Sequence, residues 1–173
     1  MKYFSCLIFL VIFLLLSYKM VFAQSSYVLP YPSSMPGSFS YKIHLIYENI
    51  SKYWYFGDFG QFAYNLKMAD KYLVEAKTLF EYKQYLLGYK ALKKSDQYYV
   101  NVLPSLLIAE KNGKNILQKK VMFDEASQKH IEVLMLMRSS IPSIFTWEPE
   151  KSASTILNLK EALDMSIRLR GGK

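Results

Sequence analysis

The sequence predicts an all-α protein, an antiparallel bundle of about five helices preceded by an extended arm rich in proline and tyrosine. Three observations support this fold class. Apolar residues recur at intervals of three and four along most of the chain, which is the spacing of one helix face. No segment shows the period-two alternation that predicts a half-buried strand. The predicted helices are joined by connections of about two to eight residues, which favour antiparallel neighbours.

The first 23 residues are predicted to be a cleavable signal peptide. Lys2 provides a basic start, residues 3–16 form an uncharged apolar run, and a more polar segment follows. Val21 and Ala23 fit the small-residue rule for signal peptidase, so we expect the mature chain to begin at Gln24. A membrane-spanning helix needs about 20 apolar residues, so an uncleaved anchor is the alternative. The predicted location is therefore secreted or extracytoplasmic, and the alternative is a membrane-anchored protein.

The rest of the chain is predicted to form an N-terminal arm followed by a single domain. Residues 24–39 are the arm, in which Pro30, Pro32 and Pro36 favour extended backbone, and residues 40–173 are the helical bundle. Cys6, the only cysteine, lies in the signal segment, so the mature chain has no disulfide or thiolate metal site. An exported domain without cysteine is typical of a bacterial cell envelope.

Each predicted helix has its own apolar stripe. The helices are expected at about 40–55, 61–82, 85–111, 115–139 and from Pro149 to Gly171, with Pro104 kinking the third. Gly88, Ala91 and Ser95 are small enough to let the third helix approach the second closely. The stripes are Ile43, Ile46, Tyr47, Ile50 and Trp54; then Phe62, Leu66, Ala69, Leu73, Ala76 and Phe80; then Tyr89, Leu92, Tyr99, Leu103 and Leu106; then Ile116, Phe123, Ala126, His130, Val133, Leu134 and Met137; and finally Ile156, Leu159, Leu163 and Ile167.

Four short motifs follow one another along the chain: Leu29-Pro30-Tyr31-Pro32 with Met35-Pro36-Gly37-Ser38-Phe39-Ser40-Tyr41, then residues 69–76, then residues 85–92, and then residues 129–134 ahead of Ile141-Pro142. In this order they resemble a bacterial family of exported helical domains, the domain-of-unknown-function family numbered 5667. Two departures are that Phe39-Ser40 replaces a step containing proline and that His44 stands near a usual lysine. The resemblance implies an exported helical fold and no assigned activity, so it transfers no catalytic residue.

The sequence offers no recognisable catalytic, cofactor-binding or metal site. His130 lies on the apolar stripe of its helix, where a buried histidine bonded to a neighbour is the expected role, because a site needs converging polar partners. With only His130 and His44, a zinc site would need several carboxylate ligands, and no such cluster is visible. We therefore predict a protein that is not an enzyme, has no cofactor and has no small-molecule substrate.

The chain is basic, with 22 lysines and arginines against 14 acidic residues. Lysine predominates, whereas nucleic-acid recognition relies on arginine, so nucleic acid is not a predicted partner. The first functional hypothesis is an exported envelope module that acts by protein contact or as a structural unit. The alternative is binding of an anionic wall polymer or membrane surface. If successive helices alternate in direction, the basic residues that would bind such an anionic surface lie at one end of the bundle. They are Lys111, Lys114, Lys119, Lys120, Arg168, Arg170 and Lys173.

Overall fold

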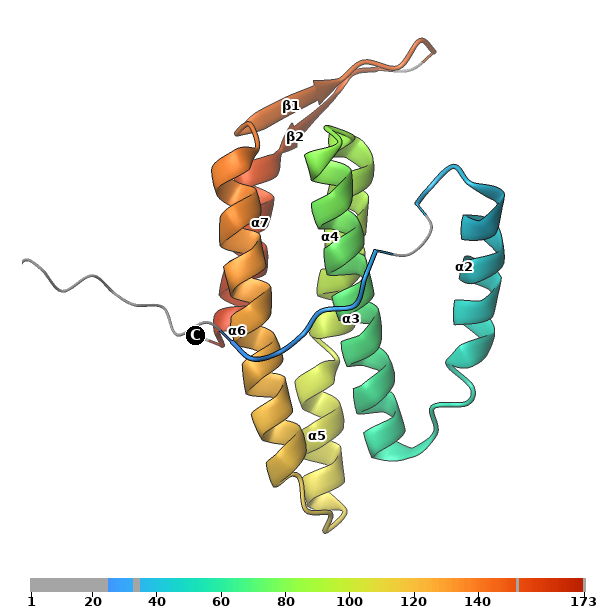
Figure 1. The fold of residues 1–173 in the computed structure, drawn as a ribbon, viewed down its shortest axis with the longest axis vertical. Helices are drawn as coiled ribbons and strands as arrows, with labels where there is room; N and C mark the ends of the chain where they lie inside the picture. Colours follow the sequence, from blue (N-terminus) through green and yellow to red (C-terminus); the bar gives the residue numbers. More distant parts are fainter. Residues whose placement is uncertain (1–24, 33–34, 152, 173) are drawn as a thin grey trace, which may run out of the picture.

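A computed structural model describes residues 25–32, 35–151 and 153–172, and within them the chain forms an antiparallel helical bundle. The predicted signal peptide with its Ala23–Gln24 cleavage site lies outside the described residues, as does Lys173. The helices are α2 (Phe39–Ser51), α3 (Gly57–Glu81), α4 (Tyr85–Tyr99), α5 (Val102–Lys111), α6 (Leu117–Ser140) and α7 (Leu159–Gly171). The bundle confirms the predicted fold class. Helices α3 and α6 run in one direction, and the α4–α5 pair and α7 run in the opposite direction (Figure 1).

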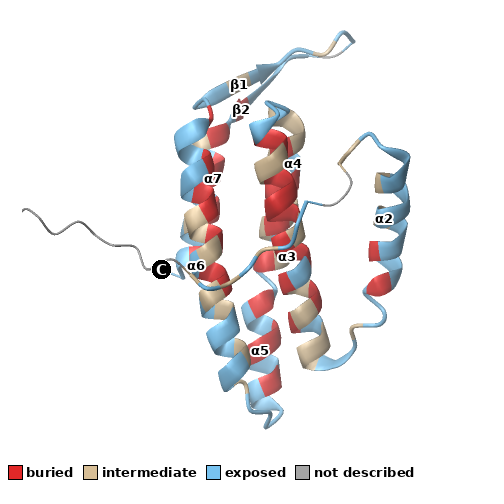
Figure 2. Ribbon diagram, viewed as in Figure 1, coloured by how far each residue is buried: buried red, intermediate tan, exposed pale blue. Residues whose placement is uncertain are grey.

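The core lies between α3, α4, α6 and α7, and α5 closes its lower end (Figure 2). The stripe predicted for the second helix is buried along its whole length, and Leu73 and Ala76 have no exposed surface. Gly88 lies against α3, where an added Cβ would come within 2.7 Å of the Phe80 ring. The close approach predicted for the small residues of α4 is therefore confirmed.

The predicted third helix is divided into α4 and α5 by a turn at Val100 and Asn101. Pro104 explains the position of this break. Its nitrogen carries no hydrogen, so it cannot donate to the carbonyl of Val100 four residues earlier, and the helix opens there. Pro104 is then the third residue of α5, where a backbone N–H has no partner within the helix in any case.

Residues 144–147 and 155–158 pair as two antiparallel strands, so the prediction of a helix beginning near Pro149 is wrong. Strand β1 (Ile144–Trp147) pairs antiparallel with β2 (Thr155–Asn158), and Phe145 lies opposite Leu157. Both strands are rich in β-branched and aromatic residues, which favour extended backbone. Leu157 is buried in the core, whereas Ile156, predicted on a helical stripe, points to solvent on the other face of the strand.

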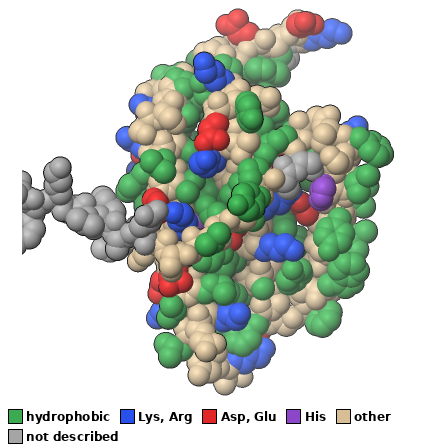
Figure 3. All heavy atoms as spheres, viewed as in Figure 1, with side chains coloured by type: hydrophobic (Ala, Val, Ile, Leu, Met, Phe, Trp, Pro, Cys, Tyr) green, Lys and Arg blue, Asp and Glu red, His purple; other side chains and the backbone are tan. Residues whose placement is uncertain are grey.

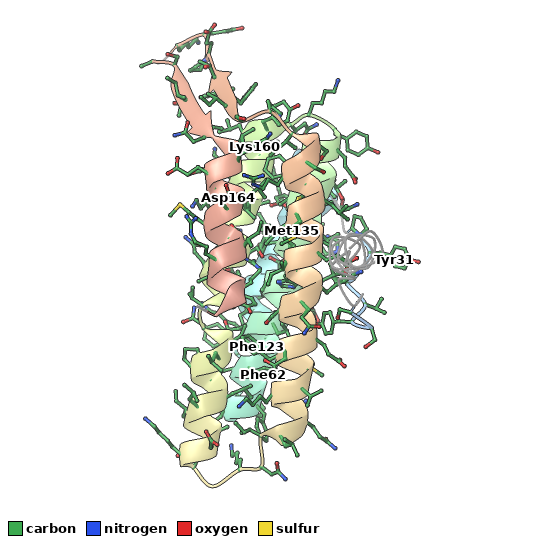
Figure 4. All side chains as sticks on the ribbon, turned by 90° about the vertical axis from the view of Figure 1, so that its left-hand side faces the viewer. Tyr31, Phe62, Phe123, Met135, Lys160 and Asp164 are labelled. Atoms are coloured by element: carbon green, nitrogen blue, oxygen red, sulfur yellow. The ribbon has the colours of Figure 1, made fainter. Side chains whose placement is uncertain are left out.

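The N-terminal arm crosses the bundle from α6 towards α2 as a strap (Figure 1). Residues 25–32 have no regular secondary structure, as predicted. The Ser25 hydroxyl donates to the backbone carbonyl of Glu125 on α6 at 2.8 Å, and Leu29 packs against the core. At the far end of the arm, Ser38 caps α2 by accepting a hydrogen bond from the backbone N–H of Tyr41. Tyr31, by contrast, points away from the bundle (Figure 4).

Candidate functional site

His130 lies at the centre of a buried polar network that joins four helices. Its Nε2 is 2.6 Å from Oδ1 of Asp70 on α3, and its Nδ1 is 3.0 Å from Nε of Arg170 on α7. Arg170 also donates to Asp96 at 2.6 Å and to the hydroxyl of Ser95 at 2.8 Å, both on α4. Every polar atom of the histidine and arginine side chains therefore faces a protein partner in the interior of the bundle.

These contacts determine the protonation of His130. Arg170 can only donate, so Nδ1 accepts, and Nε2 carries the proton and donates to Asp70. Burial lowers the pKa of His130, and the nearby positive charge of Arg170 lowers it further, against the opposing effect of Asp70. The ring is thus held neutral. It is fully buried and has no unoccupied nitrogen, so it does not offer a base to a molecule in solvent.

We expect the depressed pKa of His130 to make the protein less stable at acidic pH. The unfolded chain takes up this proton near pH 6.5, whereas the folded chain resists it, so the free energy of unfolding falls as the pH drops below about 6.5. The decline approaches about 1.4 kcal/mol per pH unit between the unfolded and folded pKa values. Urea unfolding of the wild type and His130→Asn at pH 7.5, 6.5 and 5.5 should show the difference between them shrinking.

Two details separate this effect from other titrations. Burial raises the pKa of Glu75, so that group acts in the opposite direction, but it is common to both proteins and cancels in the difference. His130→Gln, which also lacks the titratable ring, provides a second variant, and its difference from the wild type should shrink in the same way. An NMR titration that places the His130 pKa at or above 6.5 would contradict the prediction.

The sequence predicted the burial of His130 but not its partners. Asp70 follows Leu66 by four residues and precedes Leu73 by three, so it lies on the core side of α3. Arg170 continues the spacing of Leu163 and Ile167. The helical spacing of the sequence therefore placed both Asp70 and Arg170 on the core side of their helices. Arg170 was instead predicted to contact an anionic partner, and this is wrong because its guanidinium is buried against Asp96 and His130.

The predicted basic end is only partly assembled. Lys111, Lys114, Lys119 and Lys120 remain together around the connection between α5 and α6. Helix α7 starts ten residues later than predicted, because residues 155–158 form strand β2, and it ends beside His130 in the middle of α6. At 1.5 Å per residue, that position is about 20 Å along α6 from its start. Arg168 is exposed at this middle level and does not reach the four lysines.

Two of these lysines are engaged with the protein itself. Lys114 forms an ion pair with Asp58 at 2.9 Å, and Asn112 donates to the same carboxylate oxygen. These hydrogen bonds, first that of Asn112 and then that of Lys114, lower the pKa of Asp58. The Lys119 amine lies 6.0 Å from the centre of the Phe62 ring and is half-buried. Lys111 and Lys120 are exposed.

Helix α2 is joined to the bundle through polar side chains. Glu48 is buried, with one carboxylate oxygen on the amine of Lys71 and the other accepting from the Tyr72 hydroxyl at 2.7 Å. Two turns earlier, Tyr41 donates to Glu75 at 3.0 Å. The other oxygen of Glu75 is buried without a hydrogen-bond partner among the described residues, and burial raises the pKa of this carboxyl.

The opposite side of α2 is apolar and exposed, contrary to prediction. The residues of the predicted stripe were expected in the core, yet they expose 49–62 % of their surface, and Phe39 exposes 79 %. In Figure 3 these hydrophobic side chains gather along the right-hand edge of the molecule, over α2. The inward side carries Tyr41, Glu48 and the buried Ser51 instead. We call the exposed set the α2 apolar face: Phe39, Ile43, Ile46, Tyr47, Ile50 and Trp54.

A shallow groove of about 520 Å³ runs beside the arm between α3 and α6. Phe62 and Leu66 form part of its lining, and Lys67 and Lys119 flank it. The arm itself forms one side, with Tyr27 donating to Asp70 at 2.6 Å beneath it. Figure 4 shows Phe62 and Phe123 close together in the lower bundle, where Phe123 packs against the apolar cluster that contains Phe62.

Within residues 25–32, 35–151 and 153–172, no three histidine, cysteine or acidic side chains are placed to share a metal ion. Among the same residues, none of the helices combines the length and the apolar character needed to cross a membrane. No protein-family model matches the chain, and no curated protein or solved structure matches it either. The family resemblance inferred from the four motifs therefore stays a prediction.

Proposed function

We propose that the protein is an exported, non-enzymatic helical module of the bacterial cell envelope that acts by contact with another component of the envelope. The observation that carries this proposal is the α2 apolar face. Amphipathic helices of globular proteins normally bury their apolar side in the core. A contiguous apolar surface left in solvent is characteristic of interaction sites. Export is inferred from the sequence of residues 1–23.

The polar groups of the interior support a contact role over a catalytic one. His130, Asp70 and Arg170 have the chemical character of catalytic residues, but they are bonded to one another and shielded from solvent. A catalytic base must reach a substrate proton directly or through one water molecule. Here the network instead links α3, α4, α6 and α7, so that the bundle holds its surface residues in fixed positions.

The proposal is tested by binding to isolated envelope material. Ile46→Asp with Ile50→Asp places two charges on the α2 apolar face, and we expect at least a tenfold loss of cosedimentation with the envelope fraction. Met135→Asp with Leu136→Asp provides the control, since it changes two exposed apolar residues of α6 in the same way. Equal binding by all three proteins, or none by the wild type, would contradict a contact role for α2.

A second candidate function is binding of an anionic wall polymer through Lys111, Lys114, Lys119 and Lys120. The observation in its favour is that these four lysines stay together at the α5–α6 end. Lys120 lies in the first turns of α6, where the helix dipole disfavours a cation, so helix stability does not explain its position.

For this candidate we expect the triple change Lys114→Gln, Lys119→Gln and Lys120→Gln to weaken polymer binding and flatten its salt dependence. Binding of purified wall polymer would be measured at 50 and 300 mM salt. The control removes three exposed lysines elsewhere, Lys83, Lys90 and Lys151, so that the net charge of the two variants is equal. Equal binding by the two variants would show that only the net charge matters and would contradict a specific site at these lysines.

A further inference from the structure

The α2 apolar face has the composition of a helix that lies in a membrane surface. It combines three isoleucines with Tyr47 and Trp54, and Tyr53 adjoins it with 72 % of its surface exposed. Tyrosine and tryptophan are enriched at the level of the lipid headgroups, where one end of the side chain meets water. Helices that bind in this plane carry aromatic and aliphatic residues on one side and cations beside them.

The size of the face exceeds that of an ordinary surface patch. At about 200 Å² per aromatic side chain, Phe39, Tyr47, Tyr53 and Trp54 together expose roughly 500 Å². The three isoleucines add to this and take the total above the 300–600 Å² typical of the largest patch on a monomer. The edge-to-face contact of Tyr47 with Trp54, at 6.2 Å between ring centres, holds two of the aromatic rings together.

The charges around the face are all of one sign. Lys42 is exposed, and Lys52, four residues after Glu48 on the inner side of the helix, is exposed with its amine 4.9 Å from the centre of the Tyr53 ring. The only acidic residue between positions 39 and 56 is Glu48, which is buried against Lys71. Lysine side chains extend along apolar surface and keep their amines in the polar layer. An anionic surface therefore complements the border of this face, whereas a neutral apolar groove would leave its lysines without a partner.

A second copy of the chain is a poorer fit for the same reason. In a two-fold pair both copies use the same surface, so Lys42 and Lys52 of both copies would be brought to one interface. The face carries no exposed acid to offset this repulsion. A flat surface rich in anionic headgroups meets the lysines and the aromatic residues at once.

The attachment of α2 keeps this face directed outward. Glu48 and Tyr41 bond to α3 from the inner side of the helix, and α2 lies at the edge of the molecule, away from α6 and α7 (Figure 1). Resting on the proposed contact function, we infer that α2 binds an anionic lipid bilayer, with its apolar face between the headgroups and acyl chains and with Lys42 and Lys52 at the phosphates.

The test uses the purified full chain with vesicles of phosphatidylcholine alone or with 30 % phosphatidylglycerol. Trp147→Phe leaves Trp54 as the only tryptophan. We expect cosedimentation with the anionic vesicles together with a blue shift and increase of Trp54 fluorescence. Ile46→Ser with Ile50→Ser should weaken binding at least tenfold. Each of Lys42→Gln and Lys52→Gln should weaken it about fivefold, the loss expected for one lysine near an anionic surface.

Met135→Ser with Leu136→Ser is the matched control and should bind as the wild type does. Unchanged binding by the Ile46→Ser, Ile50→Ser protein would overturn the inference and place the lipid contact elsewhere, such as residues 3–16. Absence of vesicle binding would also overturn it. If envelope fractions still bind through α2 in that case, or if ultracentrifugation shows a dimer that the isoleucine changes abolish, the contact function survives with a protein partner.

Discussion

Replacing Arg170 with methionine is expected to lower the free energy of unfolding by about 3–5 kcal/mol, the usual cost of removing one partner from a buried ion pair. The guanidinium is buried and bonds to Asp96, Ser95, His130 and the backbone of Ser166. Methionine has similar length but no donor, so these groups would lose their partner in the interior. Because small domains have about 5–15 kcal/mol in total, urea denaturation should detect the loss easily.

Arg168→Met provides the control for this change. Arg168 lies two residues away on the same helix but is exposed, and a surface substitution of this kind usually changes stability by less than about 0.5 kcal/mol. Equal unfolding midpoints for the two variants would show that the network contributes nothing to stability. The comparison also separates the structural role of Arg170 from the partner-binding role that the sequence predicted for both arginines.

Leu73→Ala is expected to destabilise the fold by about 2–5 kcal/mol, the range for truncating a buried leucine. Leu73 is fully buried in the middle of α3, between α4 and α6–α7 in the main core. The cost combines the lost burial of its side-chain carbons with the cavity left behind, which a tightly packed bundle cannot fill. A thermal melt or urea titration measures it directly.

Leu136→Ala is the matched control, since it removes the same atoms from α6 where 59 % of the residue is exposed. We expect a change within about 0.5 kcal/mol for this variant. An unchanged melting temperature for Leu73→Ala would mean that the α3 seam does not face the core.

The sequence by itself determined the helices with the strongest periodicity. The seam from Phe62 to Phe80 predicted α3, and its residues are buried as expected. The extended conformation of residues 25–32 followed from the prolines of the arm, because proline restricts its own backbone and that of the residue before it. These features depend on local geometry, which a short stretch of sequence specifies.

The sequence also contained signals that competed with one another. Residues 144–147 and 155–158 are too short to show a clear strand period, and Pro149 suits the first turn of a helix as well as the end of a hairpin. Pairing of Phe145 with Leu157, and the burial of Leu157 in the core, decided in favour of strands. Such pairing depends on the neighbouring strand and not on either segment alone.

Only the tertiary structure decided how the two sides of α2 are used. The periodicity of Ile43, Ile46 and Ile50 predicted an amphipathic helix, and α2 is one. Periodicity identifies an apolar side but not what covers it. The carboxylate of Glu48 binds the amine of Lys71 and the hydroxyl of Tyr72 on α3. Burying a carboxylate costs free energy unless such partners are in place. That side of α2 is therefore held inward, and the apolar side is left in solvent.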